Sequence, residues 1–418
     1  MSKQIGETEN TTEPAPDRVR PRPRNSGPLI LGVRDFPHVV DEIAGALARG
    51  KRTVAEIRSP YRLGTKARAG QGFRSFRRDG RDLGQCSGRS PNAAGRLGAQ
   101  YTRCVRVAFL GGTYYVGPVA IPLLLAAGHD VVVAHSGAHE HPAVADVEHL
   151  HGARESLLAE GGLVERWAPE VLIDTFAPAA TAELGDALSA CASRCGTVQL
   201  IAVSSMDVYQ HCVHAGMADG SGIVPLPPQP LPLDENAQLR DKPYPGGSAG
   251  HDNVAMEAAL GQAPRLTVLR PGAIYGPYPN TRERYFVERV RDGIHELKLP
   301  DRGQQIFHAV AVERVGRAIV AALEYAPDGF WACNVVDPTY WTFAALASEV
   351  GQLLNWEWQP VGVPFQEADH PWATAHPIIG SDVRLRTILK VEEPAPREAL
   401  AETVEWLWEH RSELLPLG

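Results

Sequence analysis

The stretch that most constrains the fold is Val105–Gly137, VRVAFLGGTYYVGPVAIPLLLAAGHDVVVAHSG. An apolar run, Val105–Leu110, leads directly into a glycine-rich turn. An apolar segment follows as far as Gly128, and then comes a short β-branched run, Val131–Val133. This order predicts strand, turn, helix and parallel strand, which is the first unit of a dinucleotide-binding sheet. A tight turn in some other α/β protein is the alternative interpretation.

The turn itself has the residue types that a pyrophosphate site needs. Gly111 allows a sharp turn, while Gly112 and Gly117 allow the backbone and the helix to approach the phosphates closely. Free N–H groups at the start of the helix would face the anion. The candidate cofactor contacts in this stretch are Gly111, Gly112, Thr113, Tyr115, Val116 and Gly117.

Composition places the chain among ordinary globular proteins. It has 418 residues, 44% of them apolar and 22% charged, enough for one large or two smaller domains. No apolar run reaches the ~18–20 residues that span a bilayer, so no membrane partner is expected. The six cysteines are scattered, which favours reduced thiols and a cytoplasmic location over a disulfide scaffold.

Charge is unevenly distributed along the chain. Residues 1–100 hold 19 Lys and Arg against 10 Asp and Glu, and most of this basic excess lies in Lys51–Arg96. We expect residues 1–102 to form a basic leader of low order, with one helix at 36–49. A nucleic-acid-binding tail is the alternative. We do not favour it, because aromatic residues are few and no binding module is recognisable.

Three later segments carry a family resemblance. They are Val198–Tyr209 (VQLIAVSSMDVY), Gly250–Leu260 (GHDNVAMEAAL) and Leu266–Pro277 (LTVLRPGAIYGP). Together with the glycine turn they resemble the epimerase/dehydratase branch of the extended short-chain dehydrogenase/reductase family. The resemblance covers about residues 103–415, in the order that the family shows.

The resemblance implies an α/β fold with a Rossmann-type, doubly wound parallel sheet and a smaller C-terminal domain. We expect an NAD(P)-binding domain at 103–272 and a mainly substrate-binding part at 273–418. Residues 306–325 should pack back on the core. The proline-rich stretch 211–250 cannot be regular throughout, and both a substrate lid and a plain surface loop stay open for it.

The most informative departure from the family concerns its catalytic pair. In relatives a Tyr-x-x-x-Lys motif supplies the proton carrier and a contact to the nicotinamide ribose. Anchoring on Glu257 puts Ala249 at the tyrosine position and Asn253 at the lysine position. His251 and Tyr244 are the candidate replacements for the missing proton carrier; an exposed residue at a helix start is the alternative for His251.

The other site residues follow from matching positions. Ser205 matches the family's substrate-binding, catalytic hydroxyl, with a turn-capping serine as the alternative. Ser204, Asn253 and Pro271 are expected near the cofactor. Ser136 stands at the position where an acidic residue would favour NAD and a basic residue would favour NADP. The choice between NAD and NADP therefore stays open.

Five histidines gather after Val133: His135, His139, His141, His149 and His151. Two His-x-His pairs suggest a metal site. No acidic or cysteine ligand stands at helical spacing, however, and members of the family have similar sequence motifs (HRG and HIHGDR) at these positions. We therefore predict no metal.

Two functions stay open. One is an NAD(P)-dependent epimerase, dehydratase or reductase that acts on a nucleotide sugar or a similar small polar substrate. The other is a catalytically degenerate member that binds a nucleotide or a partner without turnover. The sequence also leaves a homodimer open.

Overall fold

A computed structural model describes residues 104–175, 180–215, 229–244, 250–261, 263, 265–325, 327–392 and 395–414. All of them belong to one compact unit, Gly84–Gly418. The expected leader with its helix at 36–49, Ala249 and parts of the proline-rich stretch lie outside the described residues. Among the described residues no helix combines the length and apolar character needed to cross a bilayer.

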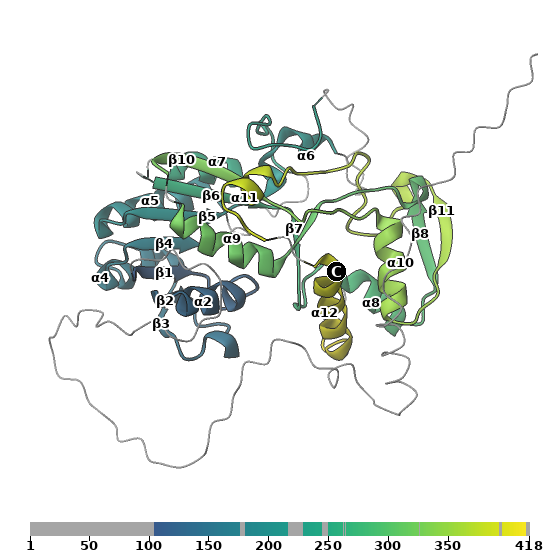
Figure 1. Cartoon of the computed structure of the whole chain (residues 1–418), viewed down its shortest axis with the longest axis horizontal. Coiled ribbons are helices and arrows are strands. Elements are labelled where there is room, and N and C mark those ends of the chain that lie inside the picture. Colours follow the sequence, from purple (N-terminus) through teal and green to yellow (C-terminus); the bar gives the residue numbers. More distant parts are fainter. Residues whose placement is uncertain are drawn as a thin grey trace, which may run out of the picture. The chain divides into compact units, whose positions relative to one another are not determined.

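The centre of the unit is a parallel sheet whose strand order is β10-β6-β5-β4-β1-β2-β3 (Figure 1). The strands are β1 (Arg106–Leu110), β2 (Asp130–His135), β3 (Glu148–His151), β4 (Val171–Asp174), β5 (Gln199–Val203), β6 (Arg265–Pro271) and β10 (Gly329–Val335). The strand order reverses between β1 and β4, as in doubly wound dinucleotide-binding sheets. The predicted Rossmann-type fold is confirmed.

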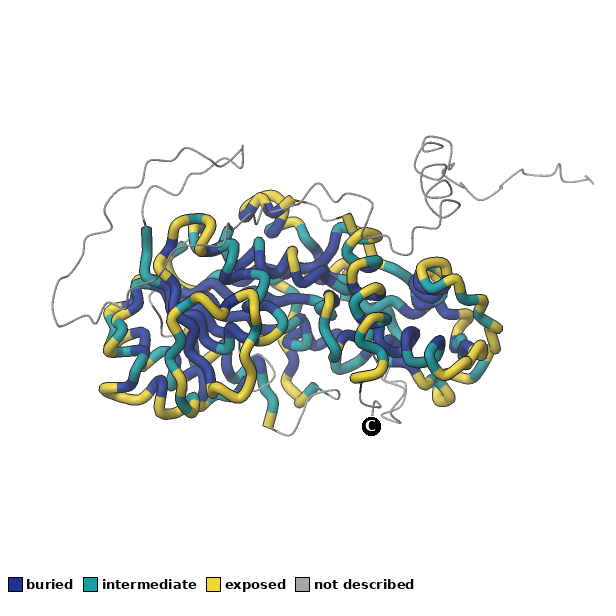
Figure 2. Tube along the Cα trace, turned by 90° about the horizontal axis from the view of Figure 1, so that it is seen from below, coloured by how far each residue is buried: buried dark blue, intermediate teal, exposed yellow. Residues whose placement is uncertain are grey.

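Helices cover both faces of this sheet, which explains why its strands are continuous apolar runs. One face packs on α2 (Gly117–Ala126) and α9 (Val312–Glu324), and the other on α5 (Ala182–Cys195) and α7 (Asn253–Leu260). Two short helices, α3 (Arg154–Leu158) and α4 (Leu163–Trp167), extend the second layer. In Figure 2 the buried residues gather along the strands and the inner helix faces.

The seventh strand comes from the part of the chain that sequence analysis assigned to substrate binding. β10 pairs with β6 from Gly329↔Arg265 to Val335↔Pro271. Helix α11 (Val383–Thr387) also packs on the main core, through Leu385. The sheet therefore extends beyond residue 272, because β6 offers a free parallel edge that β10 covers.

A second core lies beyond β6 in the chain. It is built from α8 (Arg284–Arg291), α10 (Phe343–Leu353) and α12 (Pro396–Glu409) around an aromatic cluster. Two small parallel pairs adjoin them, β7 (Ala273–Tyr275) with β9 (Ala309–Ala311) and β8 (Glu296–Pro300) with β11 (Gln359–Val363). Helix α6 (Gln210–His214) follows β5 and packs in a further apolar cluster with Leu233 and Ile378.

Candidate functional site

The glycine turn has the geometry that its sequence predicts. Gly111 adopts φ = 82°, a value that favours glycine. A Cβ on Gly117 would lie 2.1 Å from the carbonyl oxygen of Gly112, so only glycine lets α2 start this close to the turn. No side chain caps the first amides of α2, whose N-cap residue is Val116. The expected free N–H groups are not found at this helix start, because the amide of Gly117 donates to Tyr114, that of Val119 donates to Val116, and Pro118 has no amide hydrogen. The start of α2 therefore faces an anion with the positive end of its dipole.

Two tyrosines connect this turn to the segment after β7. The Tyr115 hydroxyl donates to the carbonyl oxygen of Ile274 at 2.5 Å. The Tyr114 hydroxyl accepts from Asn280 Nδ2 at 2.7 Å, and its ring lies edge-on to Tyr278. Tyr114 is 40% exposed, so its ring points away from the glycine backbone toward solvent and the C-terminal part.

The end of β2 shows no side chain that selects between NAD and NADP. Ser136 is exposed, and its hydroxyl accepts a hydrogen bond from the amide of Ala138. Thr113 is buried in the turn, with its Oγ1 3.5 Å from His135 Nδ1. The histidine at the end of β2 thus contacts the glycine turn directly.

The two serines after β5 have different surroundings. Ser204 is buried and donates to Glu257 Oε1 at 2.6 Å. Ser205 is half-buried, and its Oγ accepts from the amide of Asp207 at 3.1 Å, which caps the short helical turn that follows. Capping occupies one lone pair of the Ser205 hydroxyl and leaves its proton available to a ligand.

Asp207 is the centre of a polar cluster at this end of the sheet. Its Oδ2 lies 3.0 Å from His251 Nε2, and Asn253 Nδ2 donates to both carboxylate oxygens at 3.1 Å. Arg240 contributes a nearby positive charge, 3.9 Å from Asp207 Oδ1 and 3.0 Å from Asp252. Asn253, predicted to contact the cofactor, directs its amide group to this carboxylate.

His251 is a largely buried imidazole paired with a carboxylate. Its hydrogen bond to Asp207 raises the pKa of the imidazole above its ordinary value, and burial opposes that shift. Its side chain is 10% exposed. The other ring nitrogen, Nδ1, is buried without a hydrogen-bond partner among the described residues. The carboxylate therefore holds one ring nitrogen, and no described group competes for the other.

Tyr244 packs against the cluster that surrounds α6. Burial raises the pKa of its phenol to about 12, against the opposing charge of Arg282. The phenol thus keeps its proton at neutral pH. Arg282 itself donates to the carbonyl oxygen of Pro371 and lies over the Phe307 ring, so it is fixed by the C-terminal part.

A buried ion pair fixes the elements that carry these groups. Arg270, on β6, donates to both carboxylate oxygens of Glu257, on α7, at 3.1 and 2.6 Å. Both side chains are almost fully buried. Arg270 also donates to the Tyr209 hydroxyl. These bonds hold α7 and the segment after β5 against β6. Pro271, the last residue of β6, lies beside β10.

The sequence predicted no role for Asp207, which reaches the site from the short helical turn after β5. Arg240 had no local signal, because it reaches the Asp207 cluster from a connection between elements. The strand order fixes the distance between the glycine turn and the Asp207 cluster. Because β1 and β5 both border β4, the carboxyl ends of β1 and β5 lie about 10 Å apart.

Comparison with solved structures bears on this fold. The UDP-glucose 4-epimerase of Thermotoga maritima, solved with UDP-glucose, matches with a TM-score of 0.55 and 19% identity over 74% of this chain and 100% of that one. The Bordetella bronchiseptica enzyme WbmG, solved with NAD, matches with a TM-score of 0.56 and 18% identity over 74% and 96% of the two chains. The chain has the fold of these enzymes.

A third match is the UDP-glucose 4-epimerase of Bifidobacterium longum, solved with NAD+ and UDP, with a TM-score of 0.56 and 12% identity over 74% of this chain and 99% of that one. No model of a protein family matches the sequence, and no curated protein does either. At these identities the similarity establishes the fold, and the chemistry has to be argued from this chain's own residues.

Proposed function

We propose that this chain is an NAD(H)-dependent enzyme of the epimerase/dehydratase type that acts on a nucleotide sugar. The observation that carries the proposal is the Asp207–His251 pair, which lies at the carboxyl end of β5 next to Ser205. It occupies the part of the fold where the sequence lacks the Tyr-x-x-x-Lys pair. Three neighbours of the same fold were solved with UDP-glucose, with NAD, or with NAD+ and UDP.

The residues of the glycine turn fit a dinucleotide. Only glycine fits at 117, which lets α2 begin close to the turn with the positive end of its dipole toward a bound pyrophosphate. NAD(H), when bound, supplies hydride transfer at its nicotinamide ring. Asn253 replaces a lysine by a neutral amide that is already bonded to Asp207, so the chain offers the nicotinamide ribose no positive charge at this position.

Four side chains would orient the substrate and transfer its proton: Ser205, His251, Asp207 and Tyr244. Ser205 would orient the reacting oxygen of the substrate by a hydrogen bond. His251 Nδ1 would take the proton of that hydroxyl, or return it, while Asp207 holds Nε2–H and stabilises the imidazolium. Tyr244, with its proton retained, is the second candidate donor near the same cluster.

Binding without turnover is the second candidate function. It is favoured by the use of Asn253 as a structural partner of Asp207, since the charge that a lysine would supply is missing. In that case the Asp207–His251 pair would stabilise the fold and have no chemical role.

The test uses the full chain with NAD(H) and a panel of UDP-sugars. We expect a saturable change of tryptophan fluorescence with NAD(H), and turnover that falls about 10²- to 10⁴-fold in His251→Gln, the usual contribution of a general acid–base group. NAD affinity should stay unchanged in that variant, as should turnover in the control His295→Gln, an exposed histidine of the C-terminal part.

The outcomes separate the candidates. Saturable NAD binding without turnover, identical in wild type and His251→Gln, selects the second function. The absence of any saturable change with NAD(H) or NADP(H) overturns both.

A further inference from the structure

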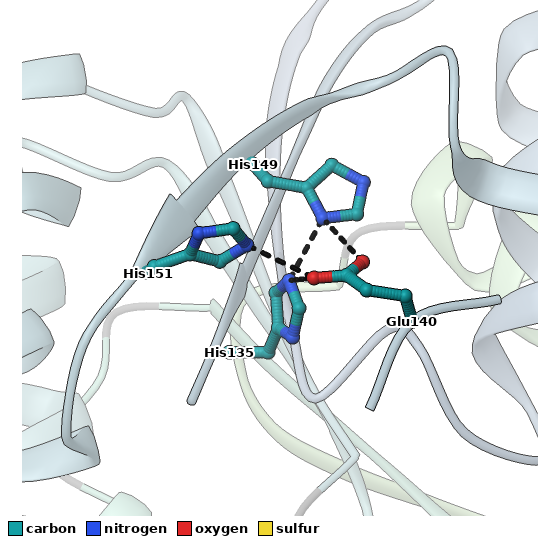
Figure 3. Close-up of side chains that lie close together, drawn as sticks. All are labelled: His135, Glu140, His149 and His151. Atoms are coloured by element: carbon teal, nitrogen blue, oxygen red, sulfur yellow. Dashed lines mark hydrogen bonds and ion pairs between the residues drawn. The ribbon is translucent and has the colours of Figure 1, made fainter. Parts of the chain in front are cut away.

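Three of the five histidines noted in the sequence converge on one acidic side chain. His135 ends β2, His149 and His151 lie on β3, and Glu140 comes from the connection between these strands. Figure 3 shows the three rings and the carboxylate directed at a common centre. Sequence analysis predicted no metal because no acidic ligand stood at helical spacing, but the β2–β3 connection brings Glu140 to the histidines.

The donor atoms are spaced as in a metal centre. One nitrogen of each histidine and a carboxylate oxygen of Glu140 all lie within 4.8 Å of one another. Glu140 oxygens lie 3.7 Å from His135 Nε2, 3.3 Å from His149 Nδ1 and 3.2 Å from His151 Nε2. Tetrahedral Zn²⁺ with bonds of about 2.0–2.1 Å sets its ligand atoms about 3.3–3.4 Å apart. The observed spacings bracket that value.

The hydrogen bonds outside the cluster orient two of the rings for this purpose. The Nε2–H of His149 donates to the carbonyl oxygen of Val144 at 2.9 Å, which leaves the lone pair on Nδ1 facing the centre. Backbone carbonyls are frequent partners of the second nitrogen of metal-bound histidines. His135 Nδ1 has the Thr113 hydroxyl at 3.5 Å, and this hydroxyl can accept a hydrogen bond from Nδ1 when that nitrogen carries the ring proton.

The contact between His135 and His149 can be made by a ring proton or by a metal ion. Their nitrogens, Nε2 and Nδ1, face each other at 2.8 Å. Without a metal ion, one proton has to lie between them, donated by His135 while its Nδ1 accepts from the amide of Gly137. Binding of a metal ion at Nε2 would move this proton to Nδ1 of His135, where the Thr113 hydroxyl can accept its hydrogen bond in place of the one that Gly137 now donates.

Two of the four ligand side chains are buried and two are exposed to solvent. The side chains of His135 and His149 are 5% and 12% exposed, whereas those of His151 and Glu140 are 54% and 55% exposed. The buried pair is held by the sheet and the exposed pair lies at the surface, so an ion can enter from solvent. Two neighbouring histidines, His139 and His141, are not part of the cluster.

We propose that His135, His149, His151 and Glu140 form a binding site for a divalent transition-metal ion of the Zn²⁺ class. Three imidazoles and one carboxylate favour Zn²⁺, Co²⁺ or Ni²⁺ over Mg²⁺ and Ca²⁺, which prefer sets of oxygen ligands. None of the four ligands belongs to the Asp207–His251 pair, so metal binding can be measured separately from turnover.

The experiment titrates the full chain, free of any affinity tag and stripped with a chelator, with Zn²⁺ by calorimetry and with Co²⁺ by absorption spectroscopy. We expect one equivalent to bind, with the intense visible bands of tetrahedral Co²⁺ and no thiolate charge-transfer band. His151→Ala should weaken binding by at least about 10-fold, since even the loss of an outer-shell partner costs 10–100-fold. His149→Ala should abolish binding.

Two design features keep the test decisive. His151 is exposed, so its removal leaves the fold intact, and melting temperature checks this for His149→Ala. The matched control is His139→Ala, an exposed histidine on the same connection, whose affinity should equal that of wild type. Failure of wild type to bind a stoichiometric ion, unchanged affinity in His151→Ala, or a thiolate band in the Co²⁺ spectrum would each overturn the proposal.

Discussion

At the glycine turn the proposed ligand contacts come from the backbone, whereas at the end of β5 they come from side chains. Gly111 and Gly117 are fixed by a positive φ and by a 2.1 Å approach to Gly112, and Tyr114 points away. The end of β5 depends on Asp207, His251 and their partners. A site made of backbone groups therefore keeps its geometry when its side chains change, provided that the glycines remain. An acid–base site without the tyrosine and lysine needs other side chains to carry the proton.

The largest expected effect concerns the frame of the side-chain region. Glu257→Gln leaves the buried Arg270 guanidinium without its counter-charge. Removing one partner of a buried ion pair costs about 3–5 kcal/mol, and we expect that loss in the free energy of unfolding by denaturant titration.

The control is Asp328→Asn, which breaks the exposed pair with Arg265 and should cost at most about 1 kcal/mol. Equal losses in the two variants would contradict the structural role of Glu257.

The next effect tests the backbone region. Gly117→Ala places a Cβ against the carbonyl of Gly112 and should destabilise the chain by about 1–3 kcal/mol, the usual range for overpacking. NAD affinity should fall with it, as followed by tryptophan fluorescence.

Tyr114→Ala is the matched comparison, because it removes an exposed ring from the same turn and leaves the backbone unchanged. It should change the free energy of unfolding by less than about 1 kcal/mol and leave NAD affinity intact. Loss of NAD binding in Tyr114→Ala but not in Gly117→Ala would reverse the comparison.

The smallest effect is a pH dependence at the side-chain region. The hydrogen bond to Asp207 holds the folded-state pKa of His251 above its ordinary value of 6.5. The pair therefore stabilises the fold fully below about pH 6.5, and this contribution is lost as pH rises through the folded-state pKa.

The measurement is the stability of wild type minus that of His251→Gln, taken across neutral pH. We expect this difference to be largest at the acid end and to shrink as pH rises. A difference that grows with pH would contradict the Asp207–His251 assignment.

Much of the fold could be predicted because its signals are local. Each of these signals lies within a few consecutive residues: the run into Gly111, the apolar strands and the Leu266–Pro277 segment. Hydrophobic periodicity and the positions of glycines therefore predict them directly. The seventh strand was harder, because Gly329–Val335 joins the sheet only through the free edge of β6. His251 and Asn253 were found through the family spacing, and both reach the cluster.

The sequence by itself determined the dinucleotide-type sheet and the glycine turn, since backbone geometry there depends on adjacent residues. Only the tertiary structure decided which side chains meet: Asp207 lies 44 residues from His251, and Glu140 joins histidines on two strands. Parallel strands bring their carboxyl ends to one edge regardless of chain distance. Contacts made there follow from packing, which no local pattern encodes.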